Sequence, residues 1–113
     1  MERARRAAPR GDALLLAGGE LTWAAGPLRK GAGLCHGTAG NGFAFLKLFA
    51  RTGDERWLER ARAFAVHAAA QVAATRREYG HGRHSVWTGD LGTAVFLQHC
   101  ITGDPDLPAL EAW

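Results

Sequence analysis

The stretch from Gly31 to Gly42 reads Gly31-Ala32-Gly33-Leu34-Cys35-His36-Gly37-Thr38-Ala39-Gly40-Asn41-Gly42. It places a thiol beside an imidazole in a glycine-rich run, where backbone segments can pack closely. Cysteine and histidine are both good ligands for a soft metal ion, so the stretch indicates a metal site at Cys35 and His36. A second interpretation stays open, because the spacing completes no fixed ligand pattern: Cys35 could be a small buried hydrophobe and His36 its hydrogen-bonded neighbour.

Composition limits what such a site can belong to. The 113 residues are enough for one domain at most, and 47% hydrophobic with 22% charged residues is typical of a globular chain. The net charge of +3 comes mainly from arginine, since only Lys30 and Lys47 are lysines. These arginines are spread along the chain, which predicts solvated helix faces. No basic run is interleaved with aromatic residues, so we do not expect nucleic-acid binding.

The cysteine count and the apolar runs bear on location. Cys35 and Cys100 are the only cysteines and make no disulfide framework. No apolar segment follows the basic start at 1–6, and the longest apolar runs are too short to span a bilayer. The sequence therefore predicts a cytoplasmic chain with no transmembrane segment.

The first 27 residues are expected to form a helical lead-in. A short helix over 2–8 should end at Pro9, with Asp12 as the N-cap of a second helix that runs to Ala25. After it, Arg29 and Lys30 stand just before the glycine-rich stretch. They are candidates for binding an anionic group of a substrate, and a solvated turn is the alternative interpretation.

Three helices are predicted downstream. Residues 39–50 are apolar on nearly every side and must be buried, whereas residues 55–78 have apolar positions at helical spacing and should be half exposed. A polar loop over 79–87 precedes a second nearly all-apolar helix, which begins near residue 88 and ends at 102–105. Three histidines fall outside any ligand pattern, with His67 expected at a packed or rim position and His81 and His84 in an exposed loop.

The two apolar helices are repeats of each other. Gly37–Gly40 corresponds to Gly89–Gly92, and the turn at 51–54 corresponds to the turn at 101–104, a period of roughly fifty residues. A buried helix followed by an outer one is the unit of an α/α barrel. Since such units bury their apolar faces against neighbours, two of them predict an all-α arc of an α/α toroid, an incomplete barrel made of two helical-hairpin repeats.

The same residues carry a family resemblance. The run from Lys30 to Gly42 followed by Ala44-Phe45-Leu46, then 85–92 and 106–108, resembles the C-terminal part of the lanthionine synthetase C-like (LanC-like) family. The resemblance covers about Leu28 to Leu110. It implies a single partial domain over 1–113, in which 1–27 are the lead-in and 28–113 hold the zinc-loop repeat and the final repeat.

The resemblance also implies a chemistry. Members of the family are α/α toroids in which zinc activates a thiol for addition to dehydroalanine or dehydrobutyrine; the thiol belongs to a peptide cysteine or to glutathione. Cys35 and His36 match two of the three zinc ligands. The third ligand, a cysteine, and the family's catalytic histidine and aspartate lie in upstream repeats without counterpart here, so no catalytic residue is assigned.

The implied function is therefore that of a C-terminal fragment, inactive by itself, whose enzymatic status is left open. Its partners would be a peptide or protein containing dehydroamino acids, glutathione, and the missing N-terminal part or another chain. The alternative is a non-catalytic helical interaction module with uncovered apolar faces. A carbohydrate-active toroid would need paired carboxylates, but Asp54, Asp90 and Asp104 stand at turns where they are explained as caps.

Overall fold

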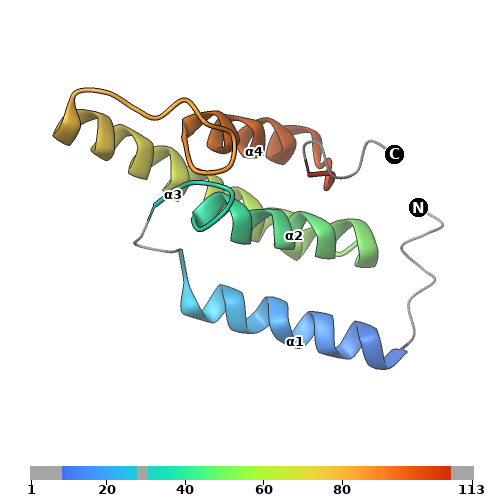
Figure 1. The fold of residues 1–113 in the computed structure, drawn as a ribbon. Helices are drawn as coiled ribbons and strands as arrows, with labels where there is room; N and C mark the ends of the chain where they lie inside the picture. The colour runs from blue at the N-terminus through green and yellow to red at the C-terminus, as the bar shows by residue number, and fades with distance from the viewer. Residues whose placement is uncertain (1–8, 28–30, 108–113) are drawn as a thin grey trace.

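A computed structural model describes residues 9–27 and 31–107 of the chain. This part contains four helices and no strand: α1 (Pro9–Ala25), α2 (Thr38–Thr52), α3 (Glu55–Tyr79) and α4 (Asp90–Thr102). Figure 1 shows α2 between α1 and α4, with α3 crossing behind them. The prediction of an all-α arc is confirmed, with the largely buried α2 packed between the other helices. The second apolar helix, α4, is not buried on every side as expected, since its Leu91 and Ile101 are 51% and 73% exposed.

The start of α1 differs from the expectation. Pro9 begins this helix instead of ending an earlier one, and Asp12 lies in its first turn instead of capping it from outside. Proline is well suited to the first helical position, where its fixed φ is already helical and its missing N–H has no partner to lose. The helix expected over 2–8 lies outside the described residues.

The ends of the other helices follow the predicted repeat. Gly53 after α2 and Gly103 after α4 both have left-handed backbone, with φ of 71° and 76°, and each donates its N–H to the carbonyl four residues earlier, at 2.8 and 2.7 Å. Glycine is favoured at this position because a Cβ would be strained there. Asp54 then caps α3 by accepting the N–H of Arg56 at 2.9 Å.

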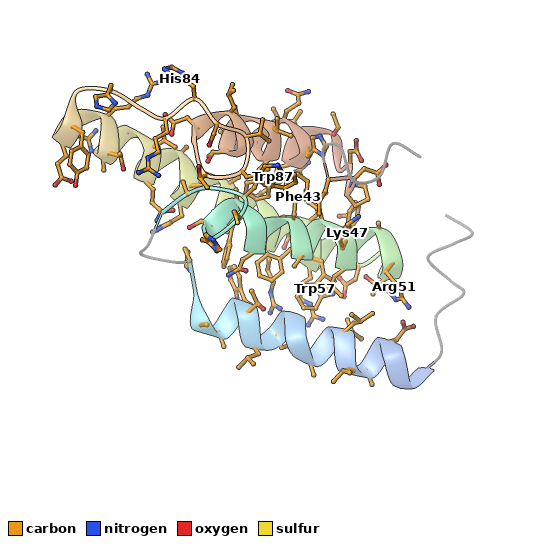
Figure 2. All side chains as sticks on the ribbon, in the orientation of Figure 1. Phe43, Lys47, Arg51, Trp57, His84 and Trp87 are labelled. Carbon is orange, nitrogen blue, oxygen red and sulfur yellow. The ribbon has the colours of Figure 1, made fainter. Side chains whose placement is uncertain are left out.

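An aromatic cluster holds α1, α2 and α3 together. Phe45 of α2 is fully buried and meets Phe64 edge to face at 4.8 Å between ring centroids, and it stacks on Trp57 at 5.9 Å. Trp23 of α1 lies 6.0 Å from the same phenylalanine. On the other side of α2, Phe43 packs against Phe96 of α4 at 5.4 Å. Figure 2 labels Phe43 and Trp57 between the ribbons.

One arginine of α3 departs from the solvated face expected for it. The Arg60 side chain is only 16% exposed, and its guanidinium lies 5.0 Å from the ring of Trp23 and 4.9 Å from that of Trp57. The same group is 3.0 Å from the Glu20 carboxylate on α1. Arg60 is therefore a packing residue that joins the outer helices, since its flat cation suits two aromatic faces.

The outward face of α1 remains apolar. Leu14 and Leu21, seven residues apart and hence on one side of the helix, are 75% and 72% exposed.

Within the described residues, no helix has the length and hydropathy needed to span a membrane.

Candidate metal centre

The loop that carries Cys35 and His36 is held by the first turn of α2. The N–H groups of Thr38, Ala39 and Gly40 donate to the carbonyls of Gly31, Ala32 and Gly33, at 2.9, 3.0 and 3.3 Å. The helix therefore binds the loop back onto its own N-terminus. A Cβ on Gly37, at the bend, would lie 2.6 Å from the Gly31 carbonyl oxygen, so the loop requires glycine there.

The corresponding loop of the second repeat lies beside the first. Cys35 donates its N–H to the Trp87 carbonyl at 2.7 Å, and the Thr93 hydroxyl of α4 donates to the Ala32 carbonyl at 3.0 Å. The backbone of Gly33 approaches Thr88 so closely that a Cβ there would be 3.3 Å from its carbonyl carbon. The second repeat thus fixes the backbone next to the candidate ligands.

The two candidate ligands point to one place. The sulfur of Cys35 and Nε2 of His36 are 3.3 Å apart, and both side chains are exposed. In a tetrahedral zinc site, sulfur at about 2.3 Å and nitrogen at about 2.05 Å from the metal are about 3.6 Å apart. The pair therefore fits two corners of such a site after a small adjustment. The alternative of a buried Cys35 is wrong.

The part of the chain that the structure describes offers no third ligand near this pair. In residues 9–27 and 31–107, no group of three or more histidine, cysteine or acidic side chains is close enough to hold one metal ion. The thiol of Cys100 is buried in the core, where it faces the Ala61 carbonyl at 3.7 Å. Burial raises the pKa of Cys100 to about 12, so this thiol stays protonated near neutral pH.

The remaining sequence candidates are distributed as follows. His81 and His84 are exposed in the loop between α3 and α4, as expected. His67 is exposed on α3, so of its two expected positions the packed one is wrong. Figure 2 shows His84 at the outer edge of the molecule. Arg29 and Lys30, the candidate substrate-binding residues, lie outside the described residues.

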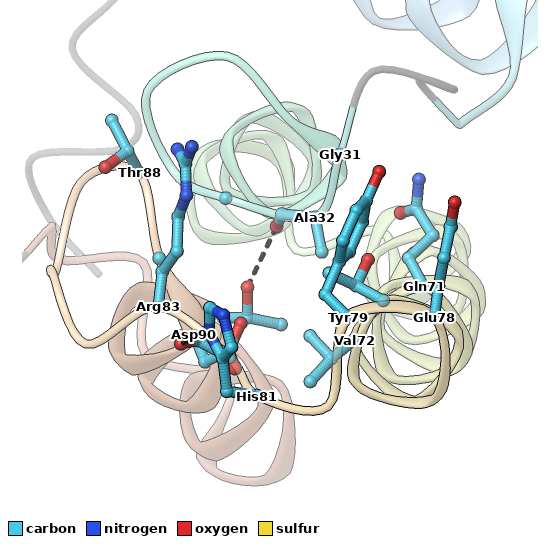
Figure 3. Close-up of a pocket in the computed structure, with 15 residues that line it drawn as sticks. Gly31, Ala32, Gln71, Val72, Glu78, Tyr79, His81, Arg83, Thr88 and Asp90 are labelled. Carbon is cyan, nitrogen blue, oxygen red and sulfur yellow. Dashed lines mark hydrogen bonds between the residues drawn. The ribbon is translucent and has the colours of Figure 1, made fainter.

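A cavity behind the loop was not predicted from the sequence. It has a volume of about 550 Å³ and lies between the Gly31–Gly33 backbone, the C-terminal half of α3 and the start of α4 (Figure 3). Neither Cys35 nor His36 lines it. The correspondence between the two repeats was the sequence signal that could have located this cavity. It predicts that the two glycine-rich loops lie side by side, and the cavity opens where these loops meet α3.

Comparison with known proteins is consistent with these features. The model of a family described as lanthionine synthetase C-like protein matches residues 14–111. Glutathione S-transferase LANCL1 of Danio rerio is 40% identical over 78 residues, which are 69% of this chain and 17% of that protein. LanC-like protein GCL1 of Arabidopsis thaliana is 51% identical over 47 residues, 42% of this chain and 11% of that protein. No solved structure matches.

The matched region includes the paired loops, α2, α3 and α4, and most of α1. The chain spans only a small part of the length of these relatives. The family model covers nearly all of the chain, including both glycine-rich loops. This chain belongs to the lanthionine synthetase C-like family.

Proposed function

We propose that residues 1–113 form one partial LanC-like domain, the C-terminal part of a zinc protein that activates a thiol for addition to dehydroalanine or dehydrobutyrine. The observation that carries this proposal is the exposed Cys35–His36 pair, 3.3 Å apart on a loop fixed by the next repeat. The similarity to a protein named glutathione S-transferase supports glutathione as one such thiol. A peptide or protein containing dehydroamino acids would be the other substrate.

In this proposal Cys35 and His36 would hold the zinc ion, and a third thiolate would come from outside this chain. When bound, zinc lowers the pKa of a thiol and so supplies a thiolate near neutral pH. The chain's own contribution is to orient the two ligands. The Cys35 N–H donates to the Trp87 carbonyl, and the preceding carbonyls at 31–33 accept N–H groups from the first turn of α2. We assign no catalytic acid or base among its residues. The cytoplasmic location expected from the free cysteines stays a prediction.

Zinc binding by the purified chain is expected to be weak and to tighten at least about a hundredfold when a small thiol is added as the third ligand. Two protein ligands leave half of a tetrahedral shell to water, which is unusual for zinc proteins. The measurement is a zinc titration against a competing chelator, with and without the thiol. A dissociation constant of about 1 nM or lower for the monomer without added thiol would contradict the proposal that this chain supplies only two zinc ligands.

Arg29 and Lys30 are proposed to offer positive charge to a carboxylate or phosphate of the substrate. In a reconstituted protein that contains the missing repeats, Lys30→Ala should therefore raise the KM for substrate several-fold and leave kcat almost unchanged, since uniform binding is lost. Steady-state kinetics at two salt concentrations test this. Unchanged kinetics would return Lys30 to a solvated turn.

A second candidate function, a non-catalytic interaction module, is favoured by the apolar outer face of α1. Large apolar side chains exposed on one helix face are typical of a binding surface. The isolated chain is therefore expected to be dimeric or aggregation-prone. Changing both Leu14 and Leu21 to glutamate should yield monomers in sedimentation experiments, whereas Val66→Glu, at an equally exposed position on α3, should not. A wild-type monomer with cooperative melting would count against this function.

A further inference from the structure

The cavity behind the ligand loop has the features of a binding site in its own right. Its volume of about 550 Å³ lies within the range of about 300–1,000 Å³ that is usual for small-molecule sites. We propose that it binds a small zwitterion, namely a short peptide with both ends free. This inference does not rest on zinc or on thiol chemistry.

Two opposite charges in the cavity lining carry the proposal. Glu78 comes from the last turns of α3 and Arg83 from the loop that follows, and Figure 3 shows them on different sides of the opening. Among the described residues, neither side chain has an ion-pair or hydrogen-bond partner. The third charge of the lining, Asp90, is already paired with Arg76 at 3.4 Å. One negative and one positive group therefore remain to meet a ligand.

This pattern selects among ligand classes. A simple anion near Arg83 would be repelled by Glu78, and a simple cation near Glu78 would be repelled by Arg83. A molecule with a carboxylate at one end and an ammonium at the other satisfies both groups, and each contact is a charge-assisted hydrogen bond. Glu78 and Arg83 are exposed, so each contact adds selectivity more than affinity.

The rest of the lining suits the body of such a molecule. Val72 and Tyr79 give an apolar wall for a side chain, and the hydroxyl of Thr75 can bind a peptide group. His81 also lines the cavity, with Nδ1 3.1 Å from the carbonyl oxygen of Gly82. A few polar groups around an apolar wall are the usual composition of a small-molecule site.

The test is an amide NMR titration of the full chain, without metal, using dialanine, N-acetyl-dialanine and dialanine amide as probes. Dialanine should shift the amide signals of Gly31, Gly33 and Gly82, which line the cavity. Blocking either end should weaken binding a few-fold, up to about fivefold, because one exposed charged contact is lost. Arg83→Gln should abolish the preference for dialanine over its amide, and Glu78→Gln the preference over the acetylated form.

Matched controls are available on the same outer helix. Arg77→Gln and Glu59→Gln remove exposed charges that do not line the cavity, and should leave dialanine binding unchanged. Cys35→Ala should also bind dialanine normally, which separates this site from the proposed metal centre. Equal binding of free and blocked dipeptides, or shifts centred on Cys35 and His36, would overturn the proposal whether or not zinc binds.

Discussion

Gly19→Ala is expected to leave the chain about 1–3 kcal/mol less stable than Gly18→Ala, although the two glycines are neighbours in one helix. A Cβ on Gly19 would lie 2.8 and 2.9 Å from two ring carbons of Trp57 and would also overlap the end of Leu48. Trp57 is fully buried, so its ring cannot move aside without disturbing Phe45. Overpacking of this kind usually costs about 1–3 kcal/mol.

Gly18 is the matched control for this prediction. A Cβ there meets nothing within 4 Å, so Gly18→Ala should stabilise α1 by about 0.5–1 kcal/mol through its higher helix propensity alone. Thermal melts of the two variants should therefore move in opposite directions, by roughly 4 °C for each kcal/mol. Equal stabilisation by both would mean that α1 does not dock on α2 and α3 through Gly19 in solution.

Much of the fold could be predicted from the sequence because its signals are local. Thr52-Gly53-Asp54 ends one helix and caps the next, and the structure places Gly53 and Asp54 in these two roles. The two Gly-x-x-Gly motifs, which begin at 37 and 89, also have similar backbone geometry. Gly37 and Gly89 have nearly the same extended conformation just before α2 and α4. The start of α1 was placed wrongly, because proline and glycine also have allowed positions inside a first helical turn.

What could not be predicted depends on contacts between distant segments. Arg60 has the sequence pattern of a solvated face, yet Trp23 enters from another helix and covers it. The cavity likewise arises from the pairing of Ala32 with Thr93, 61 residues apart, which the correspondence between the two repeats suggests but no pattern within one helix reports. No periodicity within one helix reports which faces of two helices will meet.

The same limit applies to the metal centre. The sequence indicates Cys35 and His36 as a pair, and the structure adds that both are exposed and that their donor atoms lie 3.3 Å apart. It also removes Cys100 as a replacement ligand, because that thiol faces the core carbonyl of Ala61. The proposed site is therefore open on the side where another segment could contribute a thiolate.

Cys35→Ala is expected to weaken metal binding at least about a hundredfold. Loss of a group that only orients a metal ligand already weakens metal binding about 10- to 100-fold. Cys35 would be a ligand itself, so its loss should cost at least as much. Cobalt(II) is a suitable probe, because a thiolate ligand gives it a charge-transfer absorption band. Titration without added thiol reports the ligand type, because an added thiol would give the same band, and competition with zinc measures the affinity.

Two further variants make this result specific to the pair. His36→Ala should weaken binding by a similar factor but keep the charge-transfer band of Cys35. Cys100→Ala should leave the affinity unchanged, because burial raises the pKa of its thiol to about 12 and keeps it protonated at the pH of the assay. Unchanged affinity in Cys35→Ala, together with loss of binding in Cys100→Ala, would show that the core thiol is the ligand and that the loop pair is not the metal centre.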